Sequence, residues 1–325
     1  MRSLLAVPVL LLATSATLFP AELPREGTAT VAERLARIER ILWDRDAGAV
    51  PILREWAASD ESDRVRERSI GALATLRDNR NPRVYFDRLS SDPSPRVRRA
   101  AADAIGILAI PVDRADRLST PLRKDPDPMV RAECARAIGR TGDRQAFPHL
   151  LIALGQDSSP EVRALCAEAL MTLKVAESVE VLRIAALQDR SPLVRVYAVR
   201  ALVALDPRSS AETFRTVWEL ATEADLRTAA YEGMLQTAEA GSWIESGLQD
   251  KDSHVRYLAF HAWQSGLKST LPGTRPTRNS SEVLRLETFL KDPLRGIREG
   301  ARRSLENLDY RVVEKGNAYV IAVEE

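Results

Sequence analysis

Residues 92–108 read DPSPRVRRAAADAIGIL and contain the pattern that decides the fold. Residues 159–173, SPEVRALCAEALMTL, repeat it after a further Asp at 157, and an apolar residue followed by Arg marks eight copies along the chain. Most spacings are 32 or 33 residues, with one of 29 and one of 42. Such a period indicates stacked supersecondary units. The eight pairs are Val65-Arg66, Val97-Arg98, Val130-Arg131, Val162-Arg163, Val194-Arg195, Leu226-Arg227, Val255-Arg256 and Ile297-Arg298.

Each copy is predicted to contain a helix that begins just before its apolar anchor. In most copies a Ser or Asp stands three residues before the anchor, where its side chain can accept a hydrogen bond from the first turn. Four copies then have Pro, whose fixed φ suits the first helical position. Small or apolar residues follow on one helical face, as at Val162, Cys166, Ala169, Leu170 and Leu173.

The other half of each copy contains a second amphipathic run, as in FPHLLIALGQD from Phe147. The unit is therefore predicted to be a helical hairpin. One hairpin cannot bury both of its apolar faces, so it must stack on its neighbours. We expect an all-α fold, an α-solenoid of about eight repeats over residues 48–308.

The signature D-x-x-x-x-V-R followed by A-x-x-A-[IL] resembles HEAT repeats, in the short variety of about thirty residues named after phycobilisome lyases. The resemblance is specific because the signature recurs within one chain. It implies a right-handed superhelix of hairpins. It identifies a scaffold and not a reaction.

An Arg follows the anchor in all eight copies, and an Asp stands six residues before that Arg in all but the sixth, which has Ala221. A basic stripe for phosphate or nucleic acid is one interpretation. In HEAT families, however, the matching pair forms a structural ladder along the turns, where a guanidinium satisfies a carboxylate and loop carbonyls together. The sixth copy is then the predicted bend or soft point. The ladder pairs are Asp60 with Arg66, Asp92 with Arg98, Asp125 with Arg131, Asp157 with Arg163, Asp189 with Arg195, Asp250 with Arg256, and Asp292 with Arg298.

The two ends of the chain depart from the repeat. Residues 1–24 are typical of a secretory signal peptide, with an uncleaved membrane anchor as the alternative. The protein is therefore expected to be exported to the periplasm or outside the cell, or tethered by this segment. Residues 25–47 form a predicted capping helix, in which Thr30 and Glu33 have capping-box spacing.

Near the other end, residues 268–281 read as an inserted loop, which explains the spacing of 42. The tail over residues 309–325 contains β-rich segments around Lys315, Gly316 and Asn317, so a small β-hairpin is expected there. It either caps the last repeat or offers an edge strand to a partner.

No catalytic motif, phosphate-binding loop or metal-ligand spacing is found, so no catalytic residue, metal or cofactor is assigned. Cys134 and Cys166 occupy equivalent positions of adjacent repeats, too far apart for a disulfide, and are predicted to be buried free thiols. A disulfide, or a metal site with His149, is the alternative.

The net charge of +1 gives no basic field for nucleic acid, and no membrane contact is expected beyond the N-terminal segment. In such solenoids the second helix usually lines the concave side. On these helices the middle repeats carry side chains that could form a binding surface for a protein or peptide. Ordinary core packing of the same side chains is the alternative. The residues are Leu165, Val196, Tyr197, Arg200, Tyr257, Leu258 and His261. We therefore expect a non-catalytic interaction scaffold. A bilin-lyase or isomerase-like enzyme on the same frame is the competing hypothesis.

Overall fold

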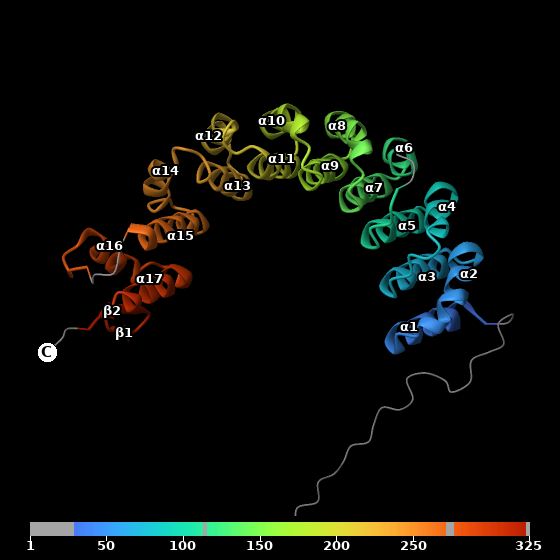
Figure 1. Ribbon diagram of the computed structural model, residues 1–325, viewed down its shortest axis with the longest axis horizontal. Helices are drawn as coiled ribbons and strands as arrows, with labels where there is room; N and C mark the ends of the chain where they lie inside the picture. The colour runs from blue at the N-terminus through green and yellow to red at the C-terminus, as the bar shows by residue number, and fades with distance from the viewer. Residues whose placement is uncertain (1–28, 113–115, 271–275, 323–325) are drawn as a thin grey trace, which may run out of the picture. The chain divides into compact units, whose positions relative to one another are not determined.

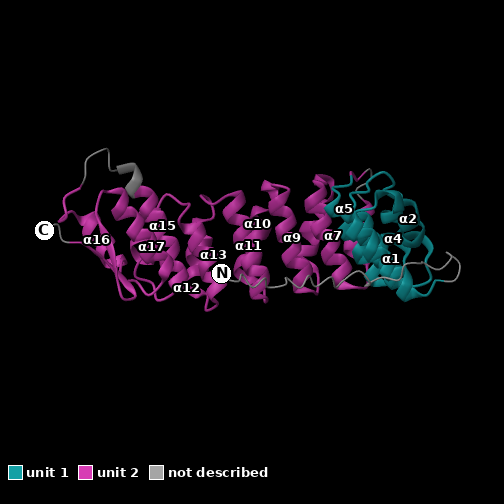
Figure 2. Cartoon of the chain, turned by 90° about the horizontal axis from the view of Figure 1, so that it is seen from below, with its two compact units in different colours: residues 1–110 teal, residues 111–325 magenta. Residues whose placement is uncertain are grey.

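A computed structural model describes residues 29–112, 116–270 and 276–322 of the chain. The leader expected over residues 1–24 lies outside these described residues. The chain divides into two compact units, residues 1–110 and 111–325 (Figure 2). Each unit is built from helical pairs, so the predicted all-α repeat fold is confirmed.

The first unit contains the predicted N-terminal helix and two helical pairs. Helices α2 and α4 form one layer, and α1, α3 and α5 form the other (Figure 1). The Thr30 side chain accepts the Glu33 N–H, and the Glu33 carboxylate accepts the Thr30 N–H, so the predicted capping box is confirmed. The elements are α1 (Val31–Asp44), η1 (Ala47–Ala49), α2 (Val50–Ser59), α3 (Asp63–Thr75), α4 (Arg83–Ser91) and α5 (Pro95–Ile107).

The second unit contains six further helical pairs and a short hairpin. Here too the helices alternate between two layers, with α8, α10 and α12 in one and α7, α9, α11 and α13 in the other (Figure 1). The first half of the unit comprises α6 (Asp116–Lys124), α7 (Pro128–Thr141), η2 (Arg144–Ala146), α8 (Phe147–Gln156), α9 (Pro160–Thr172), η3 (Ala176–Ser178), α10 (Val179–Gln188) and α11 (Pro192–Leu205). The second half comprises α12 (Ala211–Leu220), α13 (Ala224–Met234), α14 (Ala240–Gly247), α15 (Ser253–Thr270), α16 (Ser281–Phe289), α17 (Arg295–Asn307), β1 (Val312–Lys315) and β2 (Ala318–Ile321).

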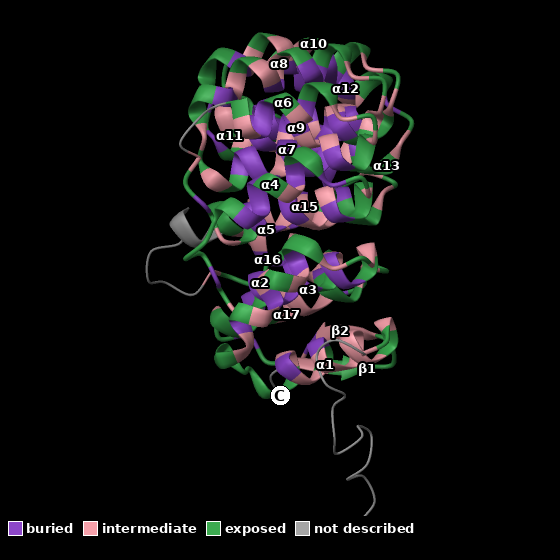
Figure 3. Ribbon diagram, turned by 90° about the vertical axis from the view of Figure 1, so that its right-hand side faces the viewer, coloured by how far each residue is buried: buried purple, intermediate pink, exposed green. Residues whose placement is uncertain are grey.

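The apolar anchor of every repeat is fully buried, with 0% of its surface exposed in all eight copies. The small residue four positions later is also 0% exposed in every copy. Small side chains allow the helices of neighbouring repeats to approach closely, so the repeated positions form the core (Figure 3). The periodicity read from the sequence therefore identified the buried face correctly.

Four odd-numbered helices begin at the predicted prolines, Pro95, Pro128, Pro160 and Pro192. The predicted side-chain caps are only partly formed, because Asp127 and Ser159 cap their helices whereas Ser94 does not. The Ser94 hydroxyl donates instead to Asp63 at 2.9 Å. The Ser94 N–H donates to Asp92 at 3.0 Å, so the ladder Asp also holds the turn that starts the helix.

The insertion is shorter than predicted. Helix α15 continues through Thr270, so residues 268–270 are helical and the expectation of a loop there was wrong. Residues 271–275 lie outside the described part of the chain.

The C-terminal hairpin pairs β1 with β2 in antiparallel register, Val312 opposite Ile321. Its turn places Gly316 at φ +64°, a conformation that favours glycine. The Tyr319 N–H donates to the Leu290 carbonyl, and Ile321 is buried. Both strands contact α17. The expected hairpin is present, and it packs on the last repeat.

Candidate interaction surface

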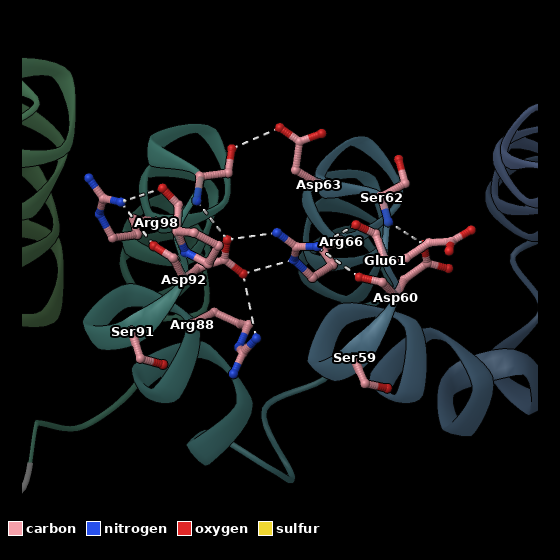
Figure 4. Close-up of polar contacts among 12 residues, drawn as sticks. Ser59, Asp60, Glu61, Ser62, Asp63, Arg66, Arg88, Ser91, Asp92 and Arg98 are labelled. Carbon is pink, nitrogen blue, oxygen red and sulfur yellow. Dashed lines mark hydrogen bonds and ion pairs between the residues drawn. The ribbon is translucent and has the colours of Figure 1, made fainter.

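The Arg/Asp ladder joins each Arg to the next repeat. Arg66 donates from Nε and Nη2 to the Asp92 carboxylate at 2.8 and 2.9 Å (Figure 4). Its Nη1 donates to the backbone carbonyls of Asp60 and Glu61 at 2.7 and 3.1 Å. The predicted carboxylate pairing of Arg66 with Asp60 in the same repeat was therefore wrong by one repeat. The reason is geometric: only the carbonyl of its own Asp lies within reach, whereas the next Asp presents its carboxylate.

The same rung recurs with nearly constant geometry. Arg131 binds Asp157 through two hydrogen bonds of 2.8 Å, and Arg163 binds Asp189 at 2.8 and 2.7 Å. Their Nη1 atoms donate to the carbonyls of Asp125 and Asp157 at 2.9 and 2.8 Å. Arg98 and Arg256 likewise donate to the carbonyls of their own repeats' Asp residues, at 2.9 Å each. The ladder holds the start of one repeat against the next.

The ladder begins earlier than the sequence indicated. Arg34 in α1 pairs with Asp60, with Nε 2.9 Å from Oδ2. Its Nη1 donates to the Ala29 carbonyl, as the other ladder arginines do to their own turns. Sequence reasoning missed this residue because Glu33 replaces the apolar anchor in front of it. Helix α1 is thus the second helix of a degenerate repeat.

Glu223 replaces the missing Asp of the sixth repeat. Arg195 donates to it through Nη2 alone, at 2.8 Å, and the Arg195 Nε is buried without a partner. The Glu223 side chain is 36% exposed, compared with 10% for Asp189 in a regular rung. The next rung is also single, since Arg227 meets Asp250 at 3.2 Å. The Arg256 rung is single as well, at 3.3 Å, so the ladder is weaker from α11 onward. The bend or soft point predicted at the sixth repeat stays a prediction.

The regular rungs shift the pKa values of their carboxyl groups. Burial alone would raise the pKa of Asp92, Asp157 and Asp189. The hydrogen bonds and charge of the arginine, together with a backbone N–H two residues later, outweigh burial and lower the pKa in each case. These groups therefore hold their charge at all but acidic pH and are structural.

A shallow groove of about 540 Å³ lies beside the weak rung. The exposed faces of α11 and the first residues of α13 line it, with Arg195 and Glu223 crossing between the two helices. Its lining residues are Pro192, Leu193, Val196, Tyr197, Arg200, Glu223, Ala224 and Asp225.

Three of the seven residues predicted to bind a partner line this groove: Val196, Tyr197 and Arg200. Val196 is buried at 8% exposure, so it forms the floor and the expectation that it is an outward contact was wrong. Tyr197 is half-buried and Arg200 is exposed. Leu193, 44% exposed, was missed because it lies one residue before the anchor, outside the positions considered.

The other four predicted residues do not line the groove. Leu165 is half-buried on α9. Tyr257, Leu258 and His261 are half-buried on α15, where the Tyr257 and His261 rings make an edge contact at 4.3 Å. A Cβ on Gly296 of α17 would lie 3.0 Å from the Tyr257 ring, so this tyrosine packs on the neighbouring helix. The predicted residues are thus divided among the groove, α9 and α15.

Both cysteines are buried and unpaired, as predicted. Burial raises the pKa of the Cys134 and Cys166 thiols, so neither is a reactive thiolate. Burial and the charge of Arg123 lower the pKa of His149. Among the described residues no group of three or more His, Cys, Asp or Glu side chains could hold a metal ion. Within the same residues, no helix has the length and apolar character needed to span a bilayer.

Stacked hairpins joined by an Arg/Asp ladder define a helical repeat protein. The family model for HEAT repeats matches residues 28–106, 83–171, 115–186 and 147–235, which together cover more than half of the chain. The chain belongs to the HEAT-repeat family, as the resemblance implied. No curated protein matches this sequence.

Several solved structures are similar in fold. The complex of CpcE and CpcF of phycocyanin lyase from Nostoc sp. PCC7120 is 18% identical, with a TM-score of 0.42 over 84% of this chain and 97% of that one. A mutant of Kap121p is 15% identical, with a TM-score of 0.50 over 89% of this chain and 34% of that chain. Human deoxyhypusine hydroxylase is 18% identical, with a TM-score of 0.35 over 83% of this chain and 98% of that one. The similarity to Kap121p shows the fold alone.

Proposed function

We propose that this protein is a non-catalytic scaffold that binds a protein or peptide partner in the groove between α11 and α13. The observation that carries this proposal is the exposed Leu193 and Arg200 together with the half-buried Tyr197 beside the irregular rung. Apolar, aromatic and Arg side chains in one recess are the composition of binding hot spots.

The irregular rung supports this choice of site over the rest of the odd-helix layer. In a regular rung the arginine makes two short bonds to a nearly buried carboxylate, so its donors are fully used. At Arg195 one short bond to the partly exposed Glu223 leaves Nε without a partner. The partly exposed Glu223 carboxylate, and not the buried Arg195 Nε, is therefore the ionic group that a partner seated in the groove can reach.

We further propose that the chain acts outside the cytoplasm, released or tethered by its N-terminal segment. The apolar stretch within residues 1–24, preceded by Arg2, supports export. The competing bilin-type enzyme would act inside the cell. Cell fractionation with N-terminal sequencing of the mature chain separates the two, because an intact N-terminus in the cytoplasm would contradict export.

The binding proposal is tested by photo-cross-linking in the native cell. A photoreactive amino acid replaces Leu193 in the groove in one variant and Ile184 on α10 in the other. The two side chains are matched in exposure, at 44% and 50%, and Ile184 does not line the groove. We expect one discrete cross-linked protein from position 193 and none from position 184.

The outcome that contradicts the proposal is equal cross-linking from both positions, or none from position 193 while the chain is folded and abundant. Far-UV circular dichroism of each purified variant checks folding. The adduct at position 193 is identified by mass spectrometry, which gives the partner and its contact peptide.

A further inference from the structure

The last rung of the ladder is open. Arg298 on α17 donates from Nη1 to the carbonyls of Asp292 and Pro293 at 2.7 and 2.8 Å. Arg66, Arg131 and Arg163 are held by their own turns in the same way. In those repeats the Nε and Nη2 atoms of the arginine donate two hydrogen bonds to the Asp carboxylate of the next repeat. Among the described residues, no carboxylate meets this edge of Arg298.

The hairpin packs on α17 but leaves a hollow on the ladder side. A pocket of about 430 Å³ is lined there by Lys291, Asp292, Pro293, Arg298, Asn317 and Ala318. The Asp292 carboxylate is already engaged, since it accepts from Arg256 at 3.3 Å and from the Leu294 N–H at 2.7 Å. The charges left for a ligand are therefore the Arg298 fork and the exposed Lys291.

We propose that this pocket is a carboxylate-binding site, which takes an acidic side chain or a free C-terminus from a protein ligand. Elsewhere in this chain the same guanidinium, fixed by the same two backbone carbonyls, binds a carboxylate bidentately at 2.7 to 2.9 Å. The two carbonyl bonds hold the Arg298 fork in place before any ligand arrives, so little side-chain entropy is lost on binding.

This site is separate from the groove at α11 and is independent of the function proposed for it. The Arg298 pocket is polar and positively charged, whereas the groove combines Leu193 and Tyr197 with Arg200. Phosphate also suits an arginine fork. The other rungs of the ladder all bind a planar carboxylate, so we assign a carboxylate and not a phosphate to this pocket.

The test is acetate titration of the full chain, labelled with ¹⁵N-arginine and followed by the Nε–H resonances at constant ionic strength with chloride as the balancing anion. The Arg298 resonance is assigned by its disappearance in Arg298→Lys. We expect it to shift in a saturable manner, while Arg163, whose fork is occupied, does not move. Arg295, with a side chain 83% exposed, provides the control for non-specific ion pairing.

Three results would overturn the proposal. In the first, Arg298 shifts no more than Arg295. In the second, inorganic phosphate saturates the resonance at a lower concentration than acetate, which makes the pocket a phosphate site. In the third, the full chain does not respond but a variant ending at Ala322 does, which shows that the chain's own C-terminal Glu324 or Glu325 fills the fork.

Discussion

Two parts of the second unit build the same repeat with different side chains. From α7 to α11 the helices meet through small residues: a Cβ on Gly139 would lie 3.1 Å from the Ala169 Cα. From α12 to α17 glycines make room for aromatic rings instead. A Cβ on Gly233 would lie 2.7 Å from the Phe214 ring, and one on Gly300 would lie 2.6 Å from the Phe260 ring.

The ladder changes at the same place. Its rungs are bidentate and short where the helices meet through small residues. They are single or longer where aromatic residues pack. There Arg227 lies over the Trp218 ring, 3.9 Å from its centroid, so a cation–π contact replaces part of the carboxylate pairing. The stack therefore depends on ionic rungs in one part and on ring packing in the other. The proposed groove lies at the boundary.

The largest expected effect comes from breaking a regular rung. Asp157→Ala removes the carboxylate that pairs with the nearly buried Arg131. We expect this loss to lower the unfolding free energy by about 3 kcal/mol. Glu223→Ala removes a partly exposed, single-bonded partner and should cost clearly less than Asp157→Ala. Urea unfolding of both variants measures the difference. Equal losses would show that the two rungs do not differ in strength.

Ring packing is tested by adding one methyl group. Gly233→Ala places a Cβ against the fully buried Phe214, and overpacking of this kind should cost about 1–3 kcal/mol. Gly155→Ala on α8 meets nothing within 4 Å and should stabilise the helix by up to about 1 kcal/mol. Thermal unfolding of the two variants should therefore shift in opposite directions. Destabilisation by both would implicate helix α8 in a contact that the structure lacks.

The rungs also predict a pH dependence. The pKa values of Asp92, Asp157 and Asp189 are lowered in the folded chain from an ordinary value of 3.8. The unfolded chain therefore binds protons first as the pH falls, and the stability from these groups, complete above that value, is lost below it. Unfolding free energies measured from pH 6 to pH 3 should fall, and less steeply in Asp157→Asn. An identical slope in the variant would refute the role of this carboxylate.

The smallest effect concerns the thiols of the small-residue part. Burial raises the pKa of Cys134 and Cys166, so a thiol reagent should not label the native chain and should label two thiols after unfolding without reductant. Rapid labelling of the native chain would show that the interface between α7 and α9 opens. Failure to label the unfolded chain would show a disulfide.

Much of this structure follows from the sequence. Val65 and Val97 mark buried anchors because a helical period of apolar residues depends only on local geometry. The register of the ladder could not be read in the same way. Asp92 lies six residues before Arg98 in the chain, yet its carboxylate binds Arg66 of the previous repeat, and sequence spacing does not reveal which neighbour a side chain meets.

The groove was predicted only in part for a related reason. Tyr197 and Arg200 were identified from their helical positions, but Leu193 lies one residue before the anchor, and Asp225 enters the lining because α13 begins beside α11. Tyr257 was expected to face a partner and packs over Gly296, because a glycine on the next helix leaves space that sequence reasoning did not assign to a ring. Pairwise helix contacts decide these cases.

The measurement that tests the central claim most directly is the affinity of the partner captured at position 193 for three forms of the chain. We expect Tyr197→Ala to weaken binding by tenfold or more, equivalent to about 1.4 kcal/mol, and Ile184→Ala to bind like the unaltered chain. Equal affinity of the partner for all three forms would contradict this expectation.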